Sequence, residues 1–166
     1  MTFTEYQKEA VKFRTESANN EEYLTLGLIE EVGEAAGKLA KRRRDGVFDE
    51  KAFIKELGDI LWFVANLADY WDKNEGFAYA EFIKGRDFYI AENNLLTQRE
   101  MLMVLVGDVA LFIEESLETQ LVGIITDVGI LAKTVGYTLE QVMEINLAKL
   151  RDRLSRGVIN GNGDER

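Results

Sequence analysis

The chain of 166 residues contains no cysteine, no histidine and no proline. Without cysteine it forms no disulfide and no thiolate site, and without histidine it has no histidine-dependent triad and no histidine-liganded zinc. Hydrolytic chemistry would therefore depend on carboxylates, lysine, arginine, hydroxyl groups or a metal held by oxygen atoms. Oxygen-only sites favour hard cations such as magnesium, manganese or calcium.

Positive charge is also scarce: 20 Lys and Arg stand against 30 Asp and Glu, and the net charge is −10. We expect no nucleic-acid partner, because such binding needs basic residues that neutralise phosphates. A metal-bound nucleotide is compatible with this charge, since the metal supplies positive charge locally. No hydrophobic run reaches the ~20 residues of a membrane span, and the polar start MTFTEYQKEA does not resemble a signal peptide. We expect a cytoplasmic protein with no membrane partner.

The absence of proline leaves glycine and capping residues as the signals that end helices. Hydrophobic residues make up 46% of the chain and recur at helical spacing through most of it. The sequence therefore predicts an all-α protein of six or seven helices, forming a single domain over 1–155. The tail, 156–166, has three glycines and no core pattern, and is predicted to be a flexible loop.

Capping signals locate the predicted helices. Thr4 and Gln7 would form a capping box that opens a helix over 4–17, and Asn19 or Asn20 would begin the second helix. A stretch over 73–96 is expected to hold a short helix and loops. The other predicted helices begin at Asp49, Thr97, about residue 118 and Thr138, and end at about Asp72, Ser116, residue 135 and Leu154.

The chain contains a weak internal similarity. Glu31–Ala36 aligns with Leu105–Ala110, and Glu56–Asp59 aligns with Gln120–Gly123. This would be a duplicated helix pair whose second copy lost most of its acids, although short apolar helices also resemble each other by chance. Residues 73–119 would accordingly be either an insert or part of a degenerate repeat. Asp108, at the position of Glu34, is interpreted as structural.

Five acidic residues are spaced so that each group shares one face of its helix. Glu30, Glu31 and Glu34 lie three or four residues apart, and Glu56 and Asp59 lie three apart on the next helix. Burying an unpaired carboxylate costs several kcal/mol. Acids packed between two helices would therefore need a cation, and small neighbours such as Gly33 and Gly58 favour close packing. The alternative is a solvated acidic surface.

The pattern Glu30-Glu31-x-x-Glu34, followed by Glu56-x-x-Asp59, resembles the EExxE…ExxD signature of the MazG-like all-α nucleoside-triphosphate pyrophosphohydrolases. The flanks EEVGEAAGKL and ELGDILWFVANLA are similar to that family's metal-binding helices, and TLEQVMEINLAKLRDR is similar to its substrate-side helix. The resemblance covers about 1–72 and 120–155. It implies a helical bundle of this family's type that hydrolyses nucleoside triphosphates to monophosphates and pyrophosphate.

The resemblance also implies roles for individual residues. Glu30 would be the base that activates water, or a further metal ligand. Four acids would bind Mg²⁺, which Mn²⁺ could replace: Glu31, Glu34, Glu56 and Asp59. Three residues along one stripe of the last helix would contact the triphosphate, unless that stripe is a solvated polar surface: Asn146, Lys149 and Arg153.

Further residues of the two acidic helices have alternative interpretations. Asn66, on the same face as Asp59, could bind the sugar or base, and Trp62 and Phe63 could stack on it or belong to the core. Lys38 could reach a phosphate or, as we favour, form an i, i+4 pair with Glu34.

We therefore expect a magnesium-dependent pyrophosphohydrolase of (deoxy)nucleoside triphosphates that serves nucleotide-pool housekeeping. By resemblance to the family, it would assemble as a homodimer or higher homo-oligomer. Narrower enzymatic alternatives are a dUTP or dCTP pyrophosphatase and a phosphoribosyl-ATP hydrolase. An alternative from another class is a non-catalytic helical interaction module.

Overall fold

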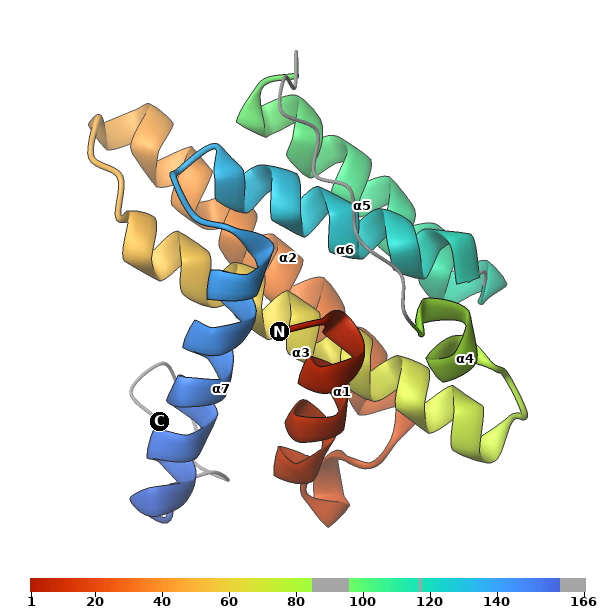
Figure 1. Cartoon of the computed structure of the whole chain (residues 1–166). Helices are drawn as coiled ribbons and strands as arrows, with labels where there is room; N and C mark the ends of the chain where they lie inside the picture. Colours follow the sequence, from red (N-terminus) through yellow and green to blue (C-terminus); the bar gives the residue numbers. More distant parts are fainter. Residues whose placement is uncertain (85–95, 117, 159–166) are drawn as a thin grey trace.

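The computed structural model describes residues 1–84, 96–116 and 118–158, and in these ranges it contains α-helices and 3₁₀ turns but no β-strand (Figure 1). The predicted all-α class is thereby confirmed. The α-helices are α1 (Phe3–Ala10), α2 (Glu21–Asp45), α3 (Glu50–Asn74), α4 (Tyr79–Ile83), α5 (Gln98–Glu115), α6 (Glu118–Lys133) and α7 (Leu139–Ser155).

Helix α3 is the centre of the fold, and it contacts α1, α2, α4, α6 and α7. A short turn joins it to α2, so these two helices run antiparallel. A second antiparallel pair, α5 and α6, lies beside them, while α1 and α7 pack across α3 from the other side (Figure 1). The sequence explains this position, because α3 buries apolar residues around most of its circumference, as only a central helix can.

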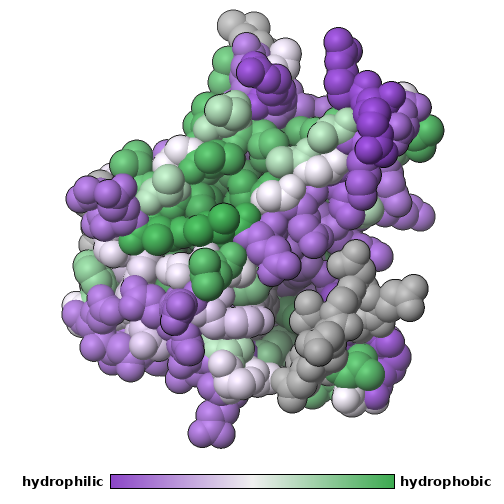
Figure 2. Space-filling model, turned by 180° about the vertical axis from the view of Figure 1, so that it is seen from behind, coloured by the Kyte–Doolittle hydropathy of each residue, from purple (hydrophilic) through white to green (hydrophobic). Residues whose placement is uncertain are grey.

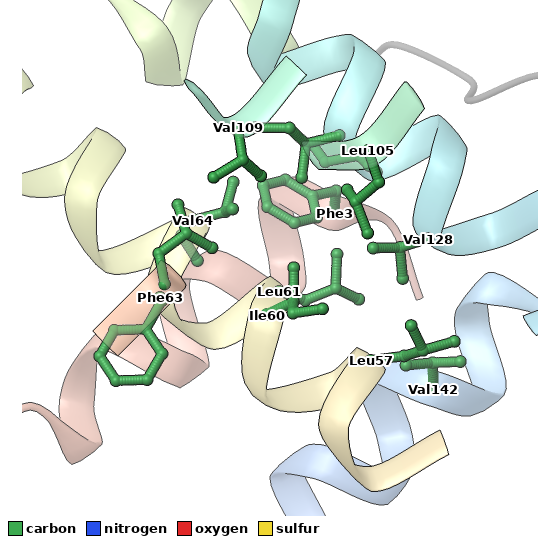
Figure 3. Close-up of a cluster of buried hydrophobic side chains, with 14 of the residues drawn as sticks. Phe3, Leu57, Ile60, Leu61, Phe63, Val64, Leu105, Val109, Val128 and Val142 are labelled. Carbon is green, nitrogen blue, oxygen red and sulfur yellow. The ribbon is translucent and has the colours of Figure 1, made fainter. Parts of the chain in front are cut away.

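One hydrophobic core connects every helix from α1 to α7. Phe3 of α1 lies among Leu61 and Val64 of α3 and Leu105 of α5, and Leu57 faces Val142 of α7 (Figure 3). The helices of the 73–119 region thus share the core of the two acidic helices. This packing fixes α7 and α1 against the part of α3 that carries Glu56 and Asp59.

Most predicted helix boundaries agree with the structure. Asn20, Asp49, Thr97 and Thr138 each accept a hydrogen bond from a backbone N–H of the helix they open. The short helix expected within 73–96 is α4. Residues 85–95 and 159–166, which include most of the predicted flexible tail, lie outside the described residues.

The prediction for the first helix was wrong at both ends. Its N-cap is Thr2, which forms a capping box with Glu5, whereas Thr4 lies inside the helix. The helix ends at Ala10 and two 3₁₀ turns follow, instead of helix as far as residue 17. Arg14 is the physical reason for the early end: its guanidinium donates to the Asn66 carbonyl at 2.8 Å and to Asp69 at 2.6 Å, which holds Arg14 against α3 with an extended backbone between the two 3₁₀ turns.

No helix among the described residues combines the length and hydrophobicity needed to span a bilayer.

In the α5–α6 pair, Asp108 packs against Gly123, where an added Cβ would lie 2.1 Å from the Asp108 Oδ2. Gly123 and Asp108 are the residues that the internal similarity aligns with Asp59 and Glu34. The duplication itself stays a prediction.

Candidate metal and nucleotide site

Three of the five predicted acids converge where α2 crosses α3. Glu31 comes from α2, Glu56 and Asp59 come from α3, and one carboxylate oxygen of each lies within 4.8 Å of the others. Among the described residues, this is the group of three acids close enough to share an ion. Glu56 is buried, and Glu31 and Asp59 are half-buried. The cluster is therefore neither a solvated surface nor a closed core.

The other two acids lie at the margin of this cluster. Glu34 is half-buried and, with Gly37, Lys38 and Lys41, lines a cavity of about 160 Å³. Glu30 is exposed to solvent on the outside of α2. A larger cavity of about 240 Å³ lies between α3 and the start of α7, but none of the five acids lines it.

Two lysines neutralise the acids on α3. Lys38 Nζ lies 2.8 Å from Glu56 Oε1, so this ion pair joins α2 to α3. Lys149, which projects from α7, pairs with Asp59 Oδ2. All four of these side chains are at most about one-fifth exposed. The two cations leave Glu31 as the member of the trio without such a counter-charge among the ion pairs of the described residues.

Glu31 is accordingly the acid whose charge is least tolerated. Burial, together with the charges of Asp59, Glu56 and Glu34, raises the pKa of Glu31 to about 8, although Lys149 acts in the opposite direction. The trio thus holds two lysine charges and, at neutral pH, a proton. A divalent cation could replace them, since clustered carboxylate oxygens are the ligands that magnesium and manganese prefer. The donor set therefore fits a hard divalent metal.

Helix α7 brings two of the predicted substrate residues to the same place. The Asn146 Nδ2 donates to Asp59 Oδ1 at 2.9 Å, beside the Lys149 contact. The Asn146 Oδ1 in turn accepts from the Tyr6 hydroxyl of α1 at 2.8 Å. Arg153 lies one turn beyond Lys149 and is half-buried. Sequence reasoning missed Tyr6, because its spacing only marks it as part of the apolar side of α1.

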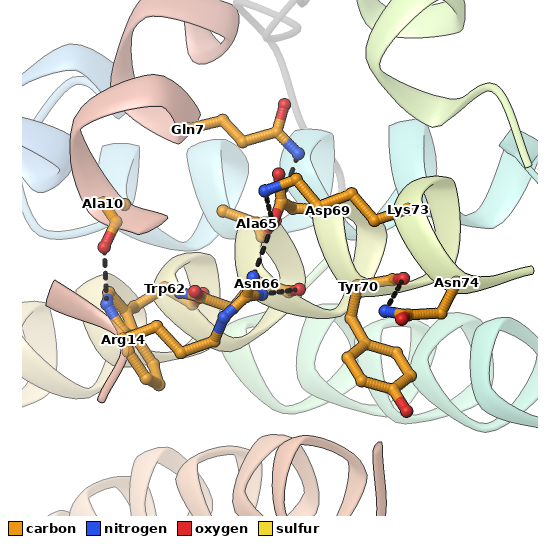
Figure 4. A network of polar contacts seen from close by, with 10 residues as sticks. All are labelled: Gln7, Ala10, Arg14, Trp62, Ala65, Asn66, Asp69, Tyr70, Lys73 and Asn74. Atoms are coloured by element: carbon orange, nitrogen blue, oxygen red, sulfur yellow. Dashed lines mark hydrogen bonds and ion pairs between the residues drawn. The ribbon is translucent and has the colours of Figure 1, made fainter. Parts of the chain in front are cut away.

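The structure encloses Asn66 away from solvent. Its Nδ2 donates to the Trp62 carbonyl at 2.8 Å, while its buried Oδ1 has no hydrogen-bond partner. Around it, Arg14 binds the Asn66 carbonyl and Asp69, and the Trp62 indole donates to Ala10 at 3.2 Å (Figure 4). In this arrangement Trp62 is tied to α1, and its possible stacking role stays a prediction.

Phe63 belongs to the core rather than to an open surface. It is 7% exposed and lies against Gly27, where an added Cβ would come within 2.2 Å of the ring. Its burial supports the interpretation of Phe63 as a core residue rather than as a stacking surface.

Comparison with known proteins finds a family match for part of the chain. Residues 19–86 match the family model described as the MazG nucleotide pyrophosphohydrolase domain. This segment is similar to the MazG family. The match contains all five acids and Asn66, and it confirms the resemblance found on α2 and α3. Residues 1–18 and 120–155, which the sequence resemblance also included, lie outside it.

A curated relative aligns with a shorter stretch. The gene 37 protein of Mycobacterium phage L5 is 44% identical over 55 residues, which are 30% of this chain and 48% of that protein. The chain therefore aligns with about half the length of this relative. No solved structure gives a significant match.

Proposed function

We propose that this protein is a metal-dependent nucleoside-triphosphate pyrophosphohydrolase, which releases pyrophosphate and leaves a nucleoside monophosphate. The observation that carries the proposal is the convergence of Glu31, Glu56 and Asp59 within the segment that matches the MazG family. A MazG nucleotide pyrophosphohydrolase domain supports the reaction class, and the clustered oxygens support a hard cation. Magnesium is the proposed ion, with manganese as a substitute.

The acids would hold the metal from two helices, with Glu34 at the edge of the site as an additional ligand. A bound metal offsets phosphate charge and acts as a Lewis acid. The exposed Glu30 can take a proton from water at the open side of α2. Lys38 and Lys149 compensate the carboxylates in the free protein. Once a cation holds those carboxylates, both ammonium groups are available for phosphate oxygens.

The substrate would approach between α2 and α7. Lys149 and Arg153 are the proposed triphosphate contacts on α7. Asn146 would have to give up its bond to Asp59 or to Tyr6 before it could bind the triphosphate as well. Asn66 would reach a sugar or base through its unpartnered Oδ1, and only after the Arg14 segment moves away. The substrates we propose are (deoxy)nucleoside triphosphates in a housekeeping role, in the cytoplasm.

We further propose a homodimer or higher homo-oligomer. Helices α2 and α5 contact each other and leave several large apolar side chains exposed. Hydrophobic side chains gather on the face seen from behind (Figure 2). Exposed apolar patches of this kind mark protein interfaces. The exposed large apolar residues of these two helices are Tyr23, Leu26, Ile29, Met103, Val104, Val106 and Leu111.

A panel assay tests the reaction. The protein is incubated with Mg²⁺ and with each of the common (deoxy)nucleoside triphosphates and phosphoribosyl-ATP, and pyrophosphate is detected. We expect release that disappears in Glu31→Gln and in Asp59→Asn. Release from dUTP or dCTP alone, or from phosphoribosyl-ATP alone, would select a narrower enzyme. No release, together with thermal stabilisation by the metal, would favour the interaction module, and inorganic phosphate as first product would contradict the proposed cleavage site.

A further inference from the structure

A buried chain of hydrogen bonds links α1 to the candidate metal site. The Tyr6 hydroxyl donates to Asn146 Oδ1 at 2.8 Å, and the Asn146 Nδ2 donates to Asp59 Oδ1 at 2.9 Å. Tyr6 is 0% exposed and Asn146 is 1% exposed. Three helices that are far apart in the sequence therefore meet in one polar contact behind the carboxylates.

The direction of this chain is fixed by its two ends. An ionised carboxylate accepts hydrogen bonds but donates none, so Asn146 must turn its NH₂ group toward Asp59. Its carbonyl oxygen then points toward Tyr6, which has to be the donor. Burial raises the pKa of Tyr6 well above its usual value, and the Asp59 charge raises it further, so the phenol keeps its proton. A flipped amide would direct a carbonyl at the carboxylate and would be repelled.

We propose that Tyr6 is a positioning residue of the metal site: through Asn146 it fixes the carboxylate of Asp59 in the orientation that faces Glu31 and Glu56. This inference rests on the metal site of the proposed function. Lys149 holds the other oxygen of Asp59, but a cation or a phosphate would compete for that contact. The Asn146 bond to Oδ1 is then the contact that keeps the carboxylate in place. Tyr6 itself reaches no solvent and touches no substrate.

Partners that hold a metal ligand from behind usually contribute 10–100-fold to metal affinity. We therefore expect Tyr6→Phe, which removes one hydroxyl and keeps the ring, to weaken Mn²⁺ binding by about 10-fold. Binding is measured by titrating the nucleotide-free protein with Mn²⁺, with free Mn²⁺ followed by electron paramagnetic resonance. This readout does not require turnover.

Tyr79→Phe is the matched control. Tyr79 is also 0% exposed, and its hydroxyl donates to the Ser116 carbonyl at 2.5 Å, at the C-terminal end of α5. Both variants lose the hydrogen bond of a buried tyrosine, so both should lower the melting temperature. Only Tyr6→Phe should lower Mn²⁺ affinity. If the two variants lost Mn²⁺ affinity equally, the cause would be a general loss of stability, and the inference would be overturned. The inference would also be overturned if Tyr6→Phe bound Mn²⁺ as tightly as the wild type.

A double-mutant cycle tests whether Tyr6 acts through Asn146. In an Asn146→Ala background the added Tyr6→Phe change should alter the Mn²⁺ dissociation constant by less than about 2-fold, because the link is already lost. If the fold-changes in the Mn²⁺ dissociation constant of the two single variants simply multiplied in the double variant, the inference would be contradicted. A wild-type protein that binds no Mn²⁺ would contradict it as well. A wild-type protein that binds Mn²⁺ but releases no pyrophosphate would refute the proposed reaction. The Mn²⁺ titrations would still decide the role of Tyr6.

Discussion

Gly58 lies directly against Asn146, so that a Cβ added at Gly58 would be 3.0 Å from the Asn146 Cβ and 3.3 Å from its Nδ2. The missing side chain lets α7 approach α3 closely enough for the amide to reach Asp59, the next residue along α3. A glycine in a helix interior costs about 0.5–1 kcal/mol relative to alanine. Here the glycine is needed in spite of that cost, because it permits the contact between the Asn146 amide and the Asp59 carboxylate.

Gly58→Ala should therefore damage the metal site although alanine is the better helix former. The new methyl group would displace α7 by a few tenths of an ångström or more and lengthen the bond from Asn146 to Asp59. We expect Mn²⁺ affinity to fall by about 10-fold, the order of effect seen when a residue that hydrogen-bonds to a metal ligand is lost. Titration with Mn²⁺ measures the change.

Gly33→Ala is the matched control for this substitution. Gly33 lies in the helical part of α2 beside the acids, but it is exposed and an added Cβ there would meet nothing within 4 Å. This variant should gain on the order of 0.5–1 kcal/mol of stability and keep its Mn²⁺ affinity. If Gly58→Ala behaved in the same way, the close approach of α7 would not matter for the site.

Local signals in the sequence were enough to predict the all-α class and most helix boundaries. The capping residues Asn20, Asp49, Thr97 and Thr138 act within one turn, so their effect is readable without knowing the neighbours. The C-terminal end of the first helix was mispredicted because it is set by a tertiary contact. Arg14 binds Asp69, which is 55 residues away, and no local pattern announces that pair.

The same distinction holds at the site. Spacing placed Glu56 and Asp59 on one face of α3, and the structure brings them together with Glu31. Spacing could not show that Lys38 pairs with Glu56 across the helix interface, or that Tyr6 stands behind Asn146. Both contacts depend on how helices cross. The family resemblance predicts a chemistry for the acids but does not indicate which residues hold them.

Metal binding should release a proton. Because the pKa of Glu31 is raised to about 8, its carboxyl is largely protonated at pH 7, and a cation that binds its oxygens must displace that proton. We expect close to one proton released per ion at pH 7, and fewer as the pH rises beyond about 8. Calorimetry of Mn²⁺ binding in buffers of different ionisation enthalpy measures this number. Proton release that does not change between pH 6 and pH 9 would show that Glu31 is not the group displaced.

Lys149 should have opposite effects on metal binding and on turnover. In the free protein its ammonium group occupies Asp59 Oδ2, so Lys149→Met removes a competitor for the carboxylate. Nucleotide-free Mn²⁺ binding should strengthen by several-fold, an effect of the order that a partly exposed ion pair contributes. Pyrophosphate release should fall by at least about 10-fold, because the phosphate contact that we propose for Lys149 is lost. A variant that loses affinity and activity in parallel would indicate a purely structural lysine.

Asp127 should make the stability of the protein depend on pH. It is 6% exposed and its Oδ2 has no hydrogen-bond partner. Burial, together with the Asp108 charge, raises the pKa of this carboxyl from 3.8 to about 7. Between about pH 4 and pH 7 the folded state then binds more protons than the unfolded state. The free energy of unfolding must therefore fall as the pH rises through this window.

Asp127→Asn removes that dependence, because the amide does not titrate. The variant should gain stability relative to wild type as the pH rises from 4 to 7, by on the order of 1–3 kcal/mol, and the difference should stay constant above that range. Urea unfolding at several pH values measures it. Asp45→Asn is the control, since Asp45 is exposed and its hydrogen bond with Arg44 lowers the pKa of its carboxyl. That variant should show no such gain, and a pH-independent difference for Asp127→Asn would mean that Asp127 is ionised in the folded protein throughout.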